Sequence, residues 1–351
     1  MRFTSERIRQ EIVSPSRKTS RLVLDFIHGC FDIFLKRNKF GTQKCALVWD
    51  IRSNPITFDI CYLVLATSNY FQKYGDNSFD VILYMPKDYT PKPFTYGNYH
   101  KSVTSEDIVE RIDNLVIPLF QSFNCVENLL IVRDRDDLLE LMRNRNIFPV
   151  NYKPRIYYPN PYDHPKTSPS INRLSKSLIP HLKIDENKLP EILEDFDKDY
   201  ATFTLRDYGF SPERNTTNDD LKAFCAMADA LNLIPIIVPD EKRNLNKYDL
   251  PSNIHISYDS RKNLYKRIVL YSKSNVNVFA PSGPFYSSLF IRGTKSIVYN
   301  MDYFDDEKPG DYGYYRGDQP YLNLSGYVLW RGSYEKLTYK ELLSSYEILS
   351  N

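Results

Sequence analysis

Residues 275–301 constrain the fold of this chain more than any other stretch of its sequence. They contain a β-prone run around Val276 and Val278, a break at Pro-Ser-Gly-Pro, a short apolar segment, and a second β-prone run at residues 296–299. Strand, sharp turn, helix and strand in this order is the repeating unit of a parallel α/β sheet. The stretch therefore predicts the α/β class, with helices on both faces of a parallel sheet.

The same alternation recurs along the rest of the chain. Short apolar runs predict strands at residues 45–50, 79–85, 128–132, 200–205, 234–238 and 254–257. Apolar residues at helical spacing predict helices at residues 58–71, 105–120, 135–143, 219–231, 263–272 and 334–349, and one or two short helices within 170–196. Two α/β units of the same design follow each other in the sequence.

A proline-rich segment, residues 148–170, separates these two units. It holds six prolines and four tyrosines, and so many prolines exclude a helix or a central strand. The chain has 351 residues, more than the roughly 250–300 that one core usually spans. We predict an N-terminal α/β domain at residues 1–165, a second at 166–333, and a C-terminal helix at 334–351 that packs back on the first domain.

Charge and cysteine content exclude several classes of function. The formal net charge of +2 gives no reason to expect nucleic acid as a partner. The five cysteines are widely spaced and mostly lie in apolar runs, which is typical of free thiols in a reducing compartment. No signal peptide and no run of about 18 apolar residues occurs. We expect a cytoplasmic protein without a transmembrane segment, a location compatible with peripheral contact at the inner face of the membrane.

The turn at Ser282 and Gly283 is a candidate anion site. The break at Pro-Ser-Gly-Pro puts these two residues where a buried helix would begin, and the free backbone N–H groups of such an end attract phosphate. The alternative is a plain strand-to-helix turn. Arg206 and Arg214, on the loop after the strand 200–205, would supply guanidinium forks for a diphosphate. Their alternative is a solvated loop in which they pair with neighbouring acids.

Several other kinds of site leave no mark on the sequence. It contains no Asp-x-Asp on an obvious strand end, no His-Glu-x-x-His and no cysteine pair, so we expect no metal and no other cofactor. It also lacks a Walker loop, a Gly-x-Gly-x-x-Gly fingerprint and a Gly-x-Ser-x-Gly elbow. These absences disfavour nucleotide hydrolases of the Walker type, dehydrogenases and serine hydrolases.

Residues 198–302 resemble the nucleotide-sugar-binding domain of GT-B-fold glycosyltransferases. The resemblance rests on TLRDYGFSPERN at residues 204–215 and on SRKNLYKRIVLYSKSNVNVFAPSGPFYSSLFIRGTKSIV at residues 260–298. It implies two Rossmann-like domains facing a cleft, and transfer of a sugar from a nucleotide sugar to a glycan or lipid-linked acceptor, as in bacterial surface polysaccharide assembly. The donor diphosphate would then bind Arg206, Arg214, Ser282 and Gly283.

The resemblance also implies roles for other residues. The first domain would hold the acceptor, with Arg52 and Asn54 as candidates, and would supply a catalytic base, with Asp50 and Asp59 as candidates. His100 and His164 are weaker candidate bases, and a helix N-terminal charge is the alternative role of Asp59. Asp240 and Arg261 are the candidates for contacting the donor nucleoside. The alternative functions are a sugar-nucleotide epimerase or hydrolase of the same fold, or a non-catalytic glycan- or nucleotide-binding protein.

Overall fold

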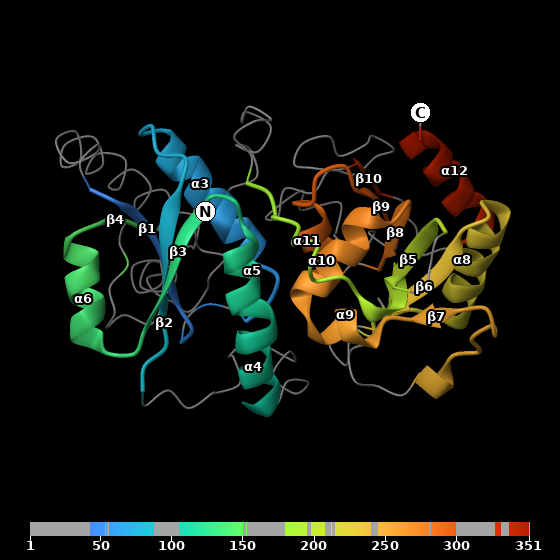
Figure 1. The fold of residues 1–351 in the computed structure, drawn as a ribbon, viewed down its shortest axis with the longest axis horizontal. Coiled ribbons are helices and arrows are strands. Elements are labelled where there is room, and N and C mark those ends of the chain that lie inside the picture. Colours follow the sequence, from blue (N-terminus) through green and yellow to red (C-terminus); the bar gives the residue numbers. More distant parts are fainter. Residues whose placement is uncertain are drawn as a thin grey trace, which may run out of the picture.

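The chain folds into two α/β domains that lie side by side (Figure 1). The computed structural model describes residues 43–52, 54, 56–87, 105–149, 152, 180–194, 198–207, 212, 215–239, 245–280, 282–299, 327–330 and 337–350. The predicted domain boundary at residues 165/166, and the histidines at 100 and 164, lie outside these residues.

The first domain is built on a four-stranded parallel sheet in the order β3-β2-β1-β4. Its strands are β1 (Cys45–Asp50), β2 (Phe79–Tyr84), β3 (Val126–Val132) and β4 (Asn146–Phe148). Every residue of β1 and β2 is buried, because helices cover both faces. The predictions of the first three strands are confirmed. The sequence did not reveal β4, because its three residues lead into the proline-rich segment.

The helices of the first domain are α3 (Ile60–Gln72), α4 (Ser105–Arg111), α5 (Ile117–Ser122) and α6 (Arg135–Arg143). A π-helical segment, η2 (Ile112–Val116), joins α4 to α5, where the sequence predicted one continuous helix. Pro118 lies in the first turn of α5 and has no N–H to donate to the preceding turn. The π-helical segment, with its wider hydrogen-bonding pattern, ends two residues before this proline.

The second domain is built on a six-stranded parallel sheet in the order β10-β9-β8-β5-β6-β7. Its strands are β5 (Tyr200–Thr204), β6 (Ile234–Val238), β7 (His255–Ile256), β8 (Val276–Phe279), β9 (Lys295–Val298) and β10 (Tyr327–Trp330). Its helices include α8 (Asn218–Ala230), α9 (Tyr258–Lys262), α10 (Leu264–Lys273) and α11 (Gly283–Ser288), with a short 3-10 helix η7 (Leu245–Lys247). The opening stretch of the sequence analysis therefore forms β8, α11 and β9, as predicted. Neither α9 nor β10 was predicted.

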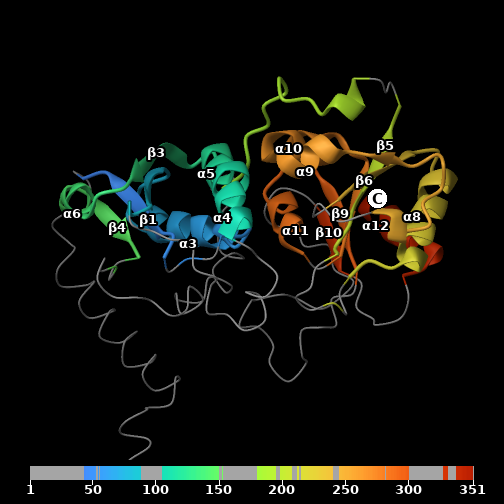
Figure 2. The same cartoon turned by 90° about the horizontal axis from the view of Figure 1, so that it is seen from below.

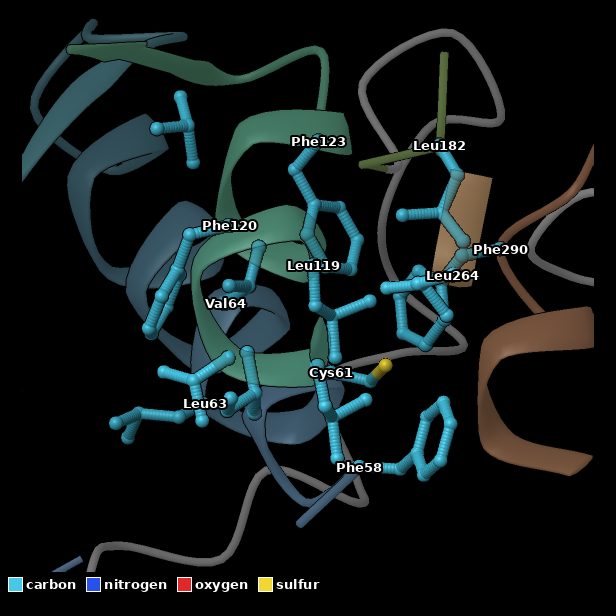
Figure 3. Close-up of a cluster of buried hydrophobic side chains, with 14 of the residues drawn as sticks. Phe58, Cys61, Leu63, Val64, Leu119, Phe120, Phe123, Leu182, Leu264 and Phe290 are labelled. Atoms are coloured by element: carbon cyan, nitrogen blue, oxygen red, sulfur yellow. The ribbon is translucent and has the colours of Figure 1, made fainter. Parts of the chain in front are cut away.

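One hydrophobic cluster continues from the first domain into the second (Figure 3). It includes Cys61 and Leu119 from the first domain and Leu264 and Phe290 from the second. The rings of Phe123 and Phe290 meet edge to face with centroids 5.3 Å apart. Such a shared core favours one defined arrangement of the two domains over a loose linkage.

A strap of three residues, 181–183, is held between the domains. His181 and Lys183 pair with the first domain, where the N–H of Asn124 donates to the carbonyl of His181 at 2.9 Å and the N–H of Lys183 donates to that of Ser122 at 2.7 Å. The N–H of Leu182 donates to the carbonyl of Phe290 in the second domain at 2.8 Å. Figure 2 shows the segment continuing past α9 and α10 to β5.

The strap corrects one prediction from the sequence. Helical spacing predicted short helices within 170–196, but the described part, 180–194, contains no α-helix and a single helical segment, the 3-10 turn η5 (Glu191–Leu193). Pro180 and Pro190 interrupt helical hydrogen bonding. The backbone groups that a helix would consume instead bond to the two domains.

The C-terminal helix α12 (Tyr339–Ser350) packs on the second domain, where the sequence analysis expected it on the first. Leu342 and Leu349 are buried in the core of the second domain together with Leu221 of α8. Lys295 of β9 also lies 5.7 Å from the ring centroid of Tyr346. The apolar side of the helix packs against α8 and the strands β9 and β10.

Candidate functional site

The central strands of the second sheet define its candidate binding edge. β5 lies between β6 and β8, so the chain leaves β5 toward one side of the sheet and returns through β8 to the other side. Open α/β sheets bind ligands beyond the carboxyl ends of strands at such a switch point. Thr204 and Phe279 are paired neighbours near the ends of these two strands. Arg206 comes two residues after Thr204 and Ser282 three residues after Phe279, so the two predicted phosphate-binding loops start from adjacent positions.

Arg206 is buried at this edge, with 4% of its surface exposed. Its backbone N–H donates to Thr216 Oγ1 at 3.0 Å, and its carbonyl accepts from the N–H of Thr216 at 2.9 Å. The guanidinium donates to Asn215 Oδ1. The loop after β5 thus folds back on itself and holds a guanidinium at the sheet edge. Arg214, its predicted partner, lies outside the described residues.

The Ser282–Gly283 turn begins helix α11, as the sequence predicted. Ser282 has an extended backbone at the N-cap position, and its hydroxyl makes no capping bond to the helix. Within the described part of the chain, Ser282 Oγ is a buried polar atom with no hydrogen-bond partner. The helix has only six residues and Pro284 follows Gly283, so the turn offers fewer N–H groups and a weaker dipole than a long helix would.

A further ion pair lies beside Arg206 that sequence reasoning did not find. Lys247 Nζ lies 2.7 Å from Asp207 Oδ1, and the same ammonium lies 4.8 Å from the ring centroid of Tyr248. Asp207 follows Arg206 in the chain, whereas Lys247 ends η7 in the connection between β6 and β7. No local signal connects these residues, which are forty positions apart.

The predicted nucleoside contacts are only partly described. Asp240, just beyond β6, lies outside the described residues. Arg261 lies on α9, the helix that follows β7, and its carbonyl accepts a hydrogen bond from Nη2 of the buried Arg267 at 3.0 Å. Both roles stay predictions.

The first sheet has a corresponding switch point between β1 and β4. Asp50, the last residue of β1, is 3% exposed. Arg52 donates to its carboxylate from Nε at 3.0 Å and from Nη2 at 2.7 Å. Tyr152, from the segment after β4, donates its hydroxyl to the same carboxylate at 2.7 Å. The two sides of the switch point are therefore joined through Asp50.

This arrangement raises the pKa values of the two side chains that donate to Asp50. Hydrogen bonding to Asp50 raises the pKa of Arg52 above its ordinary value. Burial, followed by the nearby charge of Asp50, raises the pKa of Tyr152, so this phenol stays protonated. The Arg52 guanidinium also lies 4.9 Å from the ring centroid of Tyr84. Asp50 holds Arg52 at the sheet edge, and its carboxylate accepts hydrogen bonds from both Arg52 and Tyr152.

Asn54 closes the turn after β1. Its backbone N–H and its side-chain Nδ2 each lie 2.9 Å from the carbonyl oxygen of Asp50 and donate to it. The side chain is 7% exposed. Asn54 therefore shapes the loop that carries Arg52, and its predicted acceptor contact stays a prediction.

Asp59 lies at the N-cap of α3, nine residues after Asp50 at the end of β1, and is half-buried. Thr57 Oγ1 donates to Asp59 Oδ2 at 2.6 Å, and the carboxylate makes no capping bond to the helix. Its place at the N-terminus of α3 is compatible with the alternative given above, a helix N-terminal charge. Asp59 thus holds a carboxylate at the start of α3, beside Thr57.

Phe58 brings the two predicted half-sites together. A Cβ atom added to Gly283 would lie 2.7 Å from Phe58 Cδ2, a distance that real side chains do not adopt. Phe58 belongs to the loop between β1 and α3, and Gly283 begins α11. The loop carrying Arg52 and Asp59 therefore lies directly against the predicted phosphate turn.

The described residues contain neither a metal-ligand group nor a membrane-spanning helix. No group of three or more His, Cys, Asp or Glu side chains within them could hold a metal ion. Among the helices that the structure describes, none combines the length and the apolar character needed to cross a membrane.

Several solved structures are similar to this chain, although no protein-family model and no curated protein sequence matches it. A glycosyl transferase of family 9 from Veillonella parvula aligns over 89% of this chain and 98% of its own, with a TM-score of 0.51 and 9% identity. ADP-heptose LPS heptosyltransferase II of E. coli aligns over 87% and 98%, with a TM-score of 0.49 and 11% identity. E. coli heptosyltransferase WaaC with ADP aligns over 88% and 98%, with a TM-score of 0.41 and 9% identity.

At these identities the likeness concerns the fold alone, and it is the Veillonella structure that carries it. Its alignment extends over both α/β domains of this chain. The predicted α/β class and the GT-B architecture are therefore confirmed.

Proposed function

We propose that this protein is a glycosyltransferase that moves a sugar from a nucleotide-sugar donor to a glycan or lipid-linked acceptor, as in bacterial surface polysaccharide assembly. The observation that carries the proposal is the contact between Phe58 and Gly283. It places the exit loop of the first sheet against the phosphate turn of the second. A transferase needs this meeting, because the acceptor hydroxyl must approach the donor sugar within bonding range.

The second domain would hold the donor. Arg206 and the N–H groups of the Ser282–Gly283 turn would bind the diphosphate, and Arg214 would join them. As the bond between sugar and diphosphate breaks, negative charge grows on the leaving phosphate, and preorganised donors stabilise it without reorganisation. The buried guanidinium of Arg206 suits this task, since its hydrogen bonds to the loop after β5 hold it in place. Asp240 and Arg261 would contact the nucleoside.

The first domain would hold the acceptor and supply the base. Of the two predicted carboxylates, the geometry favours Asp59. The carboxylate of Asp50 already accepts hydrogen bonds from Arg52 and Tyr152, which occupy the oxygens that a base would turn toward the acceptor hydroxyl. Asp59 directly follows Phe58, the residue in contact with the phosphate turn. A base must reach the acceptor hydroxyl within hydrogen-bond range, and the contact of the neighbouring Phe58 with Gly283 supports Asp59 in this role.

Arg52 would contact the acceptor. Its side chain is 36% exposed and is held by Asp50 in a two-bond pair. A guanidinium fixed in this way keeps its orientation at the sheet edge, so little side-chain entropy is lost when a ligand binds. Asn54 would act with it by shaping the turn.

Transfer without a metal ion, in the cytoplasm, is part of the proposal. The positive charge at the leaving diphosphate would come from arginine and backbone N–H groups, which makes a bridging cation unnecessary. The four described cysteines, Cys45, Cys61, Cys125 and Cys225, are free and buried, which is compatible with a reducing compartment.

A thermal-shift screen of nucleotide sugars tests the proposal first. A ligand that binds only the folded protein raises its melting temperature, so the donor is the compound with the largest shift. That donor is then incubated with candidate acceptors. Release of the nucleotide only when an acceptor is present supports transfer. Release without acceptor indicates a hydrolase, change of the sugar without release indicates an epimerase, and binding without any reaction indicates a non-catalytic binding protein.

A further inference from the structure

The ring of Phe58 crosses from the first domain to the second. In Figure 3 its side chain points away from the helices of the first domain and toward the second. The Cδ2, Cγ and Cβ atoms of Phe58 lie 2.7, 3.4 and 3.5 Å from the position that a Cβ atom would take at Gly283. The ring thus lies in the space that any side chain at position 283 would need. The φ angle of Gly283 is not positive, so the close approach of Phe58, and not the backbone conformation, requires glycine at this position.

Phe58 is also fixed to the start of α3. It is 8% exposed and belongs to the cluster that joins the two domains. Its carbonyl accepts from the N–H of Cys61 at 3.0 Å, and the carbonyl of Asp59 accepts from the N–H of Leu63 at 3.3 Å. Phe58 and Asp59 therefore move with the first turn of the helix. A displacement of the Phe58 ring would carry the carboxylate of Asp59 with it.

We propose that Phe58 is a positioning residue, which docks on Gly283 and thereby sets the distance between Asp59 and the donor phosphates. This role rests on the proposed function. Glycine is then required at position 283 because the Phe58 ring of the first domain fills the space that a side chain there would need. Phe58 acts on the reaction through Asp59 and contacts neither the acceptor nor the sugar.

A second contact keeps the domains together when this one is lost. The Phe123–Phe290 ring pair and the strap at Leu182 join the domains independently of Phe58. Removal of the Phe58 ring should therefore loosen the approach of Asp59 without separating the domains. Because a shift of about 1 Å at a reacting centre can cost a hundredfold in rate, we expect Phe58→Ala to lower kcat by about tenfold to a hundredfold. Its affinity for donor should change little, since the donor-binding groups lie on the other domain.

A double-mutant cycle tests the docking without any need for activity. Gly283→Ala is made in the wild-type protein and in the Phe58→Ala protein, and thermal unfolding is measured for all four. We expect Gly283→Ala to lower the melting temperature in the wild type but not in the Phe58→Ala background, where the added methyl group finds space. An equal loss in both backgrounds would overturn the docking. If Phe58→Ala does not fold, Phe58→Leu, which shortens the side chain and keeps it apolar, takes its place in the cycle.

Binding of a nucleoside diphosphate separates the two reasons for glycine. The probe is whichever of ADP, GDP or UDP stabilises the wild type in the thermal-shift screen. If the Phe58 ring alone requires the glycine, then Phe58→Ala/Gly283→Ala should bind the probe as tightly as Phe58→Ala does. Loss of binding in both backgrounds would show that the phosphate itself needs the space, and would overturn this explanation of Gly283.

Steady-state kinetics tests the positioning role. A fall in kcat for Phe58→Ala with donor affinity maintained, and partial recovery in Phe58→Leu, is the expected result. An unchanged kcat would overturn the role. If the wild-type protein transfers no sugar with any donor, the proposed function fails together with this role in catalysis, whereas the docking contact is still decided by the unfolding measurements.

Discussion

The two sheet edges share one topology and differ in the side chain that binds the guanidinium at each edge. In each domain the first strand lies between the strand that follows it and a strand from later in the chain, so both edges have a switch point. At the first edge, a carboxylate and a guanidinium hold each other, Asp50 with Arg52. At the second, the guanidinium of Arg206 donates to the side-chain amide oxygen of Asn215.

This difference teaches which edge suits which part of a reaction. An ion pair of this kind gives shape and orientation, whereas a buried guanidinium held by an amide oxygen is a fixed donor toward an anion. We therefore assign orientation of the acceptor to the first edge and binding of the diphosphate to the second. The following predictions test this assignment, from the largest expected effect to the smallest.

Replacement of Asp59 should have the largest effect. Asp59→Asn removes the proposed base and keeps the size of the side chain, so we expect kcat to fall by about 10² to 10⁴. The measurement is the initial rate of transfer at saturating donor and acceptor. Asp134→Asn is the matched control, because Asp134 is likewise an aspartate at a helix N-cap of the first domain. Equal rates for wild type and Asp59→Asn would exclude Asp59 as the base and leave Asp50 as the other candidate.

Replacement of Arg206 should impair the second edge. We expect Arg206→Ala to lower kcat/KM by about 10² to 10³ and to weaken binding of the nucleoside diphosphate, since a fixed donor to the leaving group is lost. Arg206 is buried and bonded to Asn215, so the melting temperature will fall as well.

Arg267→Ala separates these two effects. Arg267 is also 4% exposed and also lies in the second domain, where its guanidinium donates to carbonyls of α9. Its loss should lower the melting temperature but, because Arg267 touches the proposed site only through the carbonyl of Arg261, weaken nucleotide affinity much less than loss of Arg206 does. If both variants lose affinity equally, the effect of Arg206 is one of folding and the second edge is not the diphosphate site.

Replacement of Asp50 should act mainly on stability. Asp50→Asn keeps some hydrogen bonds but removes the charge that holds Arg52, so we expect a loss of about 1–3 kcal/mol in the free energy of unfolding. Chemical denaturation gives this value directly. KM for the acceptor should rise while kcat changes less than in Asp59→Asn. A collapse of kcat at wild-type stability would contradict the orientation role of the first edge.

Removal of metal ions should have the smallest effect. Dialysis against EDTA is expected to leave the transfer rate unchanged, because the second edge supplies its positive charge from Arg206 and backbone N–H groups. The rate is measured before dialysis, after it, and after addition of Mg²⁺ or Mn²⁺. A loss that either cation restores would show that the diphosphate is neutralised by metal.

Much of the fold was predictable because its elements are long and locally consistent. The α6 helix and the strand β6 were predicted with the bounds that they have in the structure. Both have a clear apolar pattern and clear flanking signals. The strands β4 and β10, of three and four residues, were missed, and each pairs with a single neighbour, β1 and β9. The strap at 181–183 was predicted as helix for a similar reason: its hydrogen bonds all go to other segments.

The candidate site shows the same division. Residues that follow strands, such as Asp50 and Arg206, could be selected from the sequence because the carboxyl ends of parallel strands share one edge. Tyr152 could not, since it reaches Asp50 from 102 residues away. Phe58 carried no functional signal, and neither did the pairing of Lys247 with Asp207. Contacts between distant segments leave no periodicity or spacing in the sequence.

The sequence by itself determined the α/β class, the two units and the turn at Ser282–Gly283, because hydrophobic periodicity and turn residues act over a few positions. Only the tertiary structure decided that Asp50 serves Arg52, that α12 packs on the second domain, and that Phe58 fills the space beside Gly283. Each of these depends on close packing between segments far apart in the chain. Side-chain volume and hydrogen-bond geometry settle such contacts, and both exist only once the chain is folded.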